Sequence, residues 1–338
     1  MGAAADRVSR VAGRLGHMVL AVTLLSCFAF LLLPYAAPEG VPALLLTLIL
    51  LWALTSSALR APPFVLLGKY SPDAAVPWLS ALSLFGLGLA GAVSPYLTIA
   101  LRGADPRLPF IAASVGLALA TSGIIWAECR LRHEAASASP QSRPSTTDPR
   151  AFWFFVAVLL AGLGFQIHFA LNTAKLYQHL ARPDQLQYLM PVFWIGFNVL
   201  MLPASAATRR YGGLAVASAG SLVAAVASLG AVMTSDLTSL VVFQFVAGGG
   251  WGCVLMSTVA AALALGHTGR EGRLTGGLFA LLAVAAFLRI GVLARQLDAD
   301  PLIAALLTWT PVIAWGAGGV ILLCLLGVRR KIAAPATA

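Results

Sequence analysis

Residues 205–213 have the sequence Ser-Ala-Ala-Thr-Arg-Arg-Tyr-Gly-Gly and lie between two long apolar runs. The first fourteen residues, Met1 to Arg14, have a similar content of Arg and Gly and also precede an apolar run. Both segments are typical of short loops that lead into a membrane helix. We therefore predict that the chain begins in a loop from the middle of a helical repeat, so that its first repeat is cut short.

The amino-acid composition indicates a membrane protein. Of the 338 residues, 59% are apolar and 10% are charged, whereas a water-soluble globule needs more charged residues to cover its surface. Lipid offers the backbone no hydrogen bonds, so each spanning segment has to be a helix of about 20 apolar residues or part of a closed barrel. The apolar runs are continuous, without alternation of polar and apolar residues, which excludes the barrel.

The length of the apolar runs predicts an all-α fold. Ten runs are long enough to cross a membrane, so we expect a polytopic transmembrane helical bundle of about ten helices. The first run has no small-residue cleavage site before Pro34-Tyr35, so we expect it to be retained as a helix. The predicted helices cover residues 17–36, 42–66, 76–101, 108–129, 152–174, 187–206, 213–233, 238–266, 274–296 and 302–327.

The positive charges predict the orientation, because Lys and Arg beside short loops are retained on the cytoplasmic side. With the N-terminus inside, the inside segments hold fifteen of them: Arg7, Arg10, Arg14, Lys69, Arg130, Arg132, Arg143, Arg150, Arg209, Arg210, Arg270, Arg273, Arg329, Arg330 and Lys331. The outside segments hold five: Arg102, Arg107, Lys175, Arg182 and Arg295. We therefore expect an integral protein of the plasma (inner) membrane with both termini cytoplasmic. The net charge of +10 then needs no nucleic-acid partner to explain it.

A polar segment divides the helices into two groups. Residues 131–150 are rich in Arg, Ser, Pro and Thr, which is typical of a flexible cytoplasmic linker. The segment separates an N-terminal bundle of four helices (1–130) from a C-terminal bundle of six (151–338). A 4+6 arrangement is unusual for a transporter built from repeated halves, and two helices missing from the front would explain it. The alternative, a ten-helix carrier with two five-helix repeats, predicts the linker after the fifth run instead.

Several motifs resemble those of the major facilitator superfamily (MFS). Residues 5–14 and 207–213 are similar to its Gly/Asp/Arg loop between the second and third helices of each half, although both lack the leading Gly and Thr208 replaces an Asp. Weaker similarities are Gly86, Gly88, Gly91 and Ser94-Pro95, which resemble the Gly/Pro-rich fifth helix, and residues 270–276, which resemble the loop between helices ten and eleven. On this resemblance the ten runs are helices three to twelve of an MFS transporter that lacks the first two.

The reactive side chains suggest neither an enzyme nor a metal site. The five His residues are scattered, and the four Cys residues have no paired spacing. We therefore expect no catalytic residues, no metal and no cofactor. Polar groups inside membrane helices are costly, so these groups are the candidate site residues.

One group of polar residues lies on the fifth run. His168, Asn172, Lys175 and His179 are 4, 3 and 4 residues apart, which places them within about 60° of one another on a regular helix. We expect His168 and Asn172 to line a central cavity, as the first helix of the second half does in the MFS. Lys175 and His179 are better explained as anchors that reach the lipid headgroups.

Five further residues are candidates for binding a substrate. Arg289 lies well inside a helix without a nearby acid, so it has to face water, a substrate or a partner. Arg60 is either a cavity cation or a packing residue paired with Glu128. Weaker candidates are Asn198 and the pair Gln244 and Trp251, which are seven residues apart and share a helix face. For these three residues an interhelical hydrogen bond or core packing is an equal alternative. Gly248-Gly249-Gly250 predicts close approach or bending of the helix.

These residues and the resemblance together predict a secondary active transporter that moves a small, anionic or polar solute by alternating access. No carboxylate lies at mid-membrane, so coupling to a proton would involve His168 or an acid on the missing helices, or else the carrier is not proton-coupled. A non-transporting sensor or assembly factor on a degenerate transporter scaffold is the alternative function. The expected partners are the solute and the lipid bilayer.

Overall fold

The computed structural model describes residues 16–36, 42–101, 103–135, 150–266 and 271–333. These residues are almost entirely helical, with no strand among them. Ten helical segments in this part of the chain are long and apolar enough to cross a membrane. The predicted all-α polytopic bundle is therefore confirmed. The loop at residues 5–14 and most of the predicted linker, residues 136–149, lie outside the described residues, and the predicted domain boundary stays a prediction.

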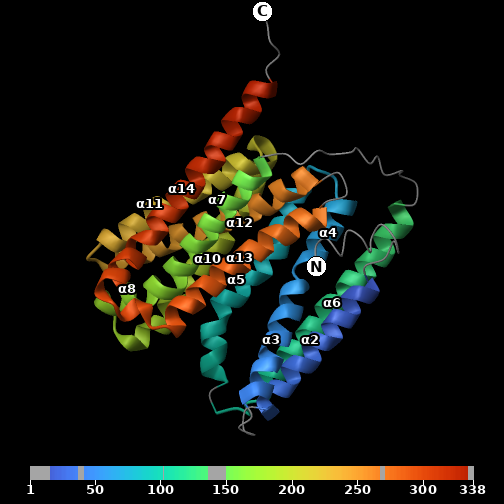
Figure 1. Ribbon diagram of the computed structural model, residues 1–338, viewed down its shortest axis with the longest axis horizontal. Helices are drawn as coiled ribbons and strands as arrows, with labels where there is room; N and C mark the ends of the chain where they lie inside the picture. The colour runs from blue at the N-terminus through green and yellow to red at the C-terminus, as the bar shows by residue number, and fades with distance from the viewer. Residues whose placement is uncertain (1–15, 37–41, 102, 136–149, 267–270, 334–338) are drawn as a thin grey trace, which may run out of the picture. The chain divides into compact units, whose positions relative to one another are not determined.

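The helices follow the predicted apolar runs closely (Figure 1). Their bounds are α2 Gly16–Ala36, α3 Pro42–Ala58, α4 Ala61–Tyr70, α5 Val76–Ala100, α6 Leu108–Ala135, α7 Arg150–Ile167, α8 Thr173–Leu180, α9 Leu186–Leu189, α10 Pro191–Tyr211, α11 Gly213–Met233, α12 Leu237–Gly266, α13 Glu271–Ala294 and α14 Pro301–Ala333. Three short segments connect them: η1 His168–Asn172, η2 Pro183–Gln185 and η3 Leu297–Ala299. The predicted helix over 42–66 is divided into α3 and α4, because Pro62-Pro63 lacks backbone donors and fits only the first turn of a new helix.

The described helices belong to two compact units. Unit 1 contains α2, α3, α4 and α6 with end segments of α5, α12 and α13, and unit 2 contains the remainder. In unit 1, α2 packs against both α3 and α6. The hydroxyls of Thr23 and Thr121 are 2.8 Å apart, and the Glu128 carboxylate accepts the Gly16 N–H at 2.8 Å. These bonds join α2 to α6 at two levels.

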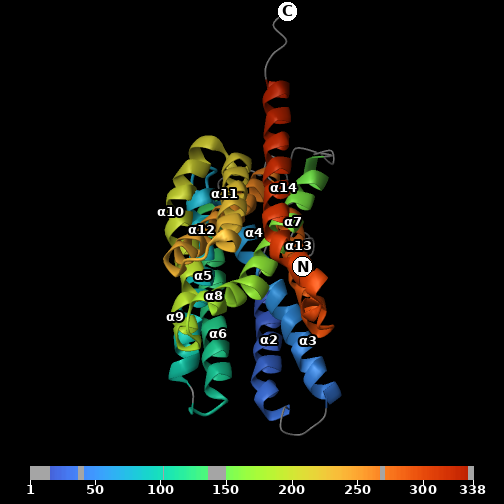
Figure 2. The same ribbon diagram turned by 90° about the vertical axis from the view of Figure 1, so that its left-hand side faces the viewer.

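Unit 2 has its core around α14, which runs alongside α7 and α11 (Figures 1 and 2). Two hydroxyls of α11 donate to backbone carbonyls of α14: Ser218 to Gly319 at 2.8 Å and Ser221 to Trp315 at 2.7 Å. Small residues and hydroxyls of this kind hold membrane helices together, because lipid supplies no hydrophobic force between them.

Helices α10 and α12 of unit 2 cross with their backbones in contact. A Cβ atom on Gly196 would meet the carbonyl of Phe245, and one on Gly248 would meet the carbonyl of Phe193. At the same level, a Cβ atom on Gly250 would lie 2.7 Å from the carbonyl oxygen of Gly220 in α11. The close approach predicted from Gly248-Gly249-Gly250 is therefore confirmed.

Two acidic residues begin helices outside the membrane spans. Asp236 precedes α12 and accepts the Ser239 N–H at 2.8 Å. Hydrogen bonds from Ser239 and Thr238 hold the pKa of the Asp236 carboxyl below its ordinary value. Asp300 precedes α14 and accepts the N–H groups of Leu302 and Ile303. Both carboxylates act as helix N-caps.

The predicted topology has a direct test. Reporter fusions that are active only outside the cytoplasm, placed at Ser139 and at Asp184, should be silent and active respectively, because the positive charges predict that the linker is inside and the 176–186 loop outside. A fusion at Arg330 should also be silent. The opposite pattern would overturn the predicted orientation.

Candidate functional site

A π-helical turn interrupts the long helix of unit 2 that consists of α7, η1 and α8. Segment η1 lies between α7 and α8, and the Thr173 hydroxyl donates to the carbonyl of His168, five residues earlier, at 2.9 Å. A π-turn contains one more residue than the α-helical turn that it replaces. The side chains on either side of it therefore do not follow the regular helical spacing from which a shared face for His168, Asn172, Lys175 and His179 was predicted.

His168 is buried between α11 and α12. Its Nε2 lies 3.0 Å from Gln244 Oε1, and its Nδ1 lies 3.1 Å from the Ser228 hydroxyl. An amide oxygen only accepts, so Nε2–H donates to Gln244 and the Ser228 hydroxyl donates to Nδ1. The imidazole also packs against the Trp315 ring, with centroids 5.2 Å apart. His168 thus joins η1 to three other helices.

The other three residues of this predicted polar group have different neighbours. The Asn172 amide donates to the carbonyl of Leu307 in α14 at 2.9 Å, and Lys175 forms an ion pair with Asp298 at 3.1 Å. His179 is exposed. The structure therefore does not bring these four side chains together along one cavity, and binding of substrate by His168 and Asn172 stays a prediction.

Gln244 and Trp251 face the same helix, as their spacing predicts. Gln244 meets His168, and Trp251 stacks on Phe165 with centroids 4.7 Å apart and planes at 3°. Within the described residues, Gln244 Nε2 and Trp251 Nε1 are enclosed without a hydrogen-bond partner. Neither residue lines the cavities of the described structure, and binding of substrate by Gln244 and Trp251 stays a prediction.

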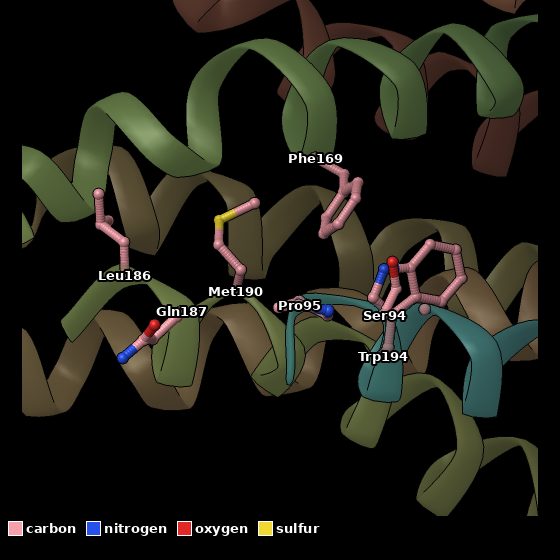
Figure 3. A pocket seen from close by; sticks show the side chains of 8 residues that line it. Ser94, Pro95, Phe169, Leu186, Gln187, Met190 and Trp194 are labelled. Atoms are coloured by element: carbon pink, nitrogen blue, oxygen red, sulfur yellow. The ribbon is translucent and has the colours of Figure 1, made fainter. Parts of the chain in front are cut away.

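A cavity of about 350 Å³ lies beside this cluster in unit 2 (Figure 3). Phe169 extends into it from η1, Trp194 faces it from α10, and Met190 faces it from the residue before α10. The remaining lining residues are Gly91, Ser94, Pro95, Leu186 and Gln187. Next to the lining, the rings of Tyr96 and Tyr188 pack with centroids 5.9 Å apart and so connect α5 to α9.

The glycines of α5 allow α10 to approach it closely. A Cβ atom on Gly91 would lie 2.5 Å from ring atoms of Trp194, and one on Gly88 would meet the amide of Asn198. When the Asn198 amide is oriented so that both its nitrogen and its oxygen have partners, it donates to the Phe85 carbonyl at 3.2 Å and accepts the Leu89 N–H at 3.0 Å. These contacts favour the interhelical hydrogen bond for Asn198, and they explain the glycine pattern of α5.

The two arginine candidates lie in different units. Arg289 is half-buried on α13 in unit 2, and its Nε is enclosed with no hydrogen-bond partner among the described residues. Arg60 lies between α3 and α4 in unit 1, where its side chain is exposed. The exposure of Arg60 makes it a weak candidate for a buried cavity cation.

The large apolar side chains that line the cavity were not among the predicted site residues. Phe169, Met190 and Trp194 lie in apolar runs, where large side chains are expected simply as core or lipid contacts. The available signal was the placement of Gly91 and Ser94-Pro95 in α5, which leaves a helix face without bulky side chains opposite an aromatic-rich segment.

Comparison with known proteins shows a structural likeness without a sequence match. No protein-family model matches the chain, and no curated protein matches its sequence. The E. coli fucose:proton symporter FucP has a TM-score of 0.64 at 10% identity, over 96% of this chain and 86% of its own.

Two further solved structures agree. The proton:xylose symporter XylE has a TM-score of 0.67 at 13% identity, over 97% of this chain and 82% of its own. The human organic anion transporter TETRAN has a TM-score of 0.61 at 14% identity, over 93% of this chain and 76% of its own. All three are described as transporters or symporters. The chain has the fold of the transporters of the major facilitator superfamily.

Proposed function

We propose that the chain is a secondary active transporter that carries a small solute across the plasma (inner) membrane by alternating access, with both termini cytoplasmic. The observation that carries this proposal is the cavity of about 350 Å³ in unit 2 of a chain with a transporter fold. Such a volume lies within the range of small-molecule sites. The fucose and xylose transporters are proton symporters, so the coupling ion that we propose is a proton.

We further propose that the solute carries an acidic or polar group. Lys175 is already paired with Asp298, whereas the enclosed Nε of Arg289 has no partner among the described residues. A guanidinium is well suited to a carboxylate or phosphate, because it offers a planar fork of donors. This feature supports an anionic solute over a cationic one.

The proposal is tested in two steps on the purified full-length chain. Thermal unfolding against a panel of small metabolites identifies solutes that raise the Tm, and proteoliposomes then measure uptake of those solutes with and without a proton gradient. Uptake that depends on the gradient supports a proton-coupled transporter. A solute that raises the Tm and is never taken up favours the non-transporting sensor.

Arg289→Lys is expected to keep the charge and the fold and to lose much of the uptake. A lysine cannot reproduce the forked geometry, so the substrate constant should worsen by about 10- to 150-fold, which corresponds to the roughly 1.5–3 kcal/mol of a charged hydrogen bond. Uptake and membrane abundance are measured together. Arg295→Lys, at an exposed position beyond the end of the same helix, is the matched control and should transport normally. Normal transport by Arg289→Lys would remove Arg289 from the site.

A further inference from the structure

Three aromatic rings beside the cavity are nearly parallel. Phe165 stacks on Trp251 at 4.7 Å with an interplanar angle of 3°, and on Phe169 at 5.9 Å with an angle of 8°. Offset stacks at such separations are favourable arrangements of aromatic side chains. Phe169 is the ring of this stack that lines the cavity. Phe165, itself stacked on Trp251, therefore supports the orientation of the Phe169 ring, which Figure 3 shows at the cavity.

Trp194 lies nearly perpendicular to the stacked rings of Phe165 and Phe169. Its plane makes an angle of 73° with Phe169 at 5.2 Å, and of 74° with Phe165 at 5.8 Å. Gly91 lies against the Trp194 indole, where a Cβ atom would come within 2.5 Å. A ring lying parallel to Phe169 would therefore be close to perpendicular to Trp194, and both arrangements are preferred by aromatic pairs.

The polarity of the lining restricts the class of ligand. The described lining contains two polar side chains, Ser94 and Gln187, and no charged one. The Gln187 amide can hydrogen-bond a polar substituent of a ligand. The described lining therefore offers aromatic faces and hydrogen bonds, and it has no charged side chain that could form an ion pair with a ligand.

We propose that the cavity binds a planar aromatic or heteroaromatic ring of the transported solute, parallel to Phe169 and perpendicular to Trp194. This inference rests on the proposed function and narrows its solute to molecules with a flat ring and a polar substituent. Phe169 and Trp194 are then the residues that determine specificity.

The test compares matched probes on the full chain in lipid nanodiscs, with empty nanodiscs subtracted. The probes are benzoate and cyclohexanecarboxylate, which has a similar size and charge without a flat ring. Saturation-transfer NMR titrations should give benzoate about 2- to 10-fold tighter than cyclohexanecarboxylate.

Variants of Phe169 connect this preference to the cavity. Phe169→Leu should remove the preference for benzoate, and Phe169→Trp should retain it because an aromatic face remains. The control is Phe287→Leu, which changes an aromatic side chain that is 73% exposed on α13 and should bind like the unmodified protein. Melting curves of all variants exclude loss of the fold as the cause.

The results separate this inference from the proposed function. Equal binding of the two carboxylates, a preference that survives in Phe169→Leu, or absence of benzoate binding would each overturn the aromatic site. Uptake of non-aromatic solutes that Phe169→Leu leaves unchanged would also overturn the aromatic site, but it would support the proposed transport function. Benzoate binding that depends on Phe169, in a protein that transports no solute of either class, would support the site and remove the transport function.

Discussion

Gly248→Ala is expected to force α10 and α12 apart and to lower the free energy of unfolding by about 3 kcal/mol, the upper end of the usual cost of overpacking. The added methyl group would meet the backbone carbonyl of Phe193, which cannot turn aside as a side chain can. The expected observations are a lower Tm in detergent and a smaller fraction of monodisperse protein. Gly196→Ala, on the other side of the same crossing, should have a similar effect.

The matched control for this prediction is Gly291→Ala. Gly291 lies in a helix of unit 2 with no described atom within 4 Å of the added Cβ atom, and Ala favours the helix over Gly. Its Tm should be unchanged or higher. If Gly248→Ala melted at the temperature of Gly291→Ala, the backbone contact between α10 and α12 would be wrong.

His168→Ala is expected to destabilise the protein by about 3 kcal/mol. The truncation removes a buried ring and its hydrogen bonds with Ser228 and Gln244. Gln244 Oε1 still accepts from the Thr173 hydroxyl at 3.3 Å, whereas Ser228 loses its acceptor, and an unsatisfied buried group costs about 1–3 kcal/mol. The space left by the ring adds the cost of a cavity. The Tm of the purified chain is the measurement, with uptake of any solute found in the screen recorded alongside it.

His179→Ala provides the comparison on the same helix. His179 is exposed, so its truncation should change stability by no more than about 0.5 kcal/mol. Equal Tm values for the two variants would show that the bonds from His168 to α11 and α12 contribute nothing measurable. A stable His168→Ala protein that has lost uptake would instead give His168 a role in transport.

The helices could be predicted well where an apolar run ends at a polar loop. The run over 213–233 coincides with α11, and the run over 238–266 differs from α12 by one residue. The prediction stopped short at residue 174, because Thr173–Leu180 continues the helix with polar residues such as Lys175 and His179. Hydropathy identifies the lipid-crossing part of a helix, and it cannot show how far a helix extends beyond the lipid.

The candidate site could be predicted only where the helical period decides the answer. The shared face of Gln244 and Trp251 follows from their spacing of seven residues, and both do meet the α7–η1 helix. The partners themselves, Ser228 for His168 and Leu307 for Asn172, lie 60 and 135 residues away in the chain. Such pairings depend on how helices pack, and no local pattern in the sequence specifies them. The same holds for the π-turn, which contains neither Gly nor Pro to mark it in the sequence.

The π-turn at His168–Asn172 also affects how this helix tolerates changes in chain length. A π-turn accommodates one surplus residue while the α-helical segments on both sides keep their orientation. Deleting one residue within it would convert the turn to a regular α-helix and leave Phe165 and Tyr177 facing their present neighbours. The same deletion in the middle of α10 would rotate every following side chain by about 100°. The long helix of unit 2 therefore has one place where its length can change without rotation of its ends.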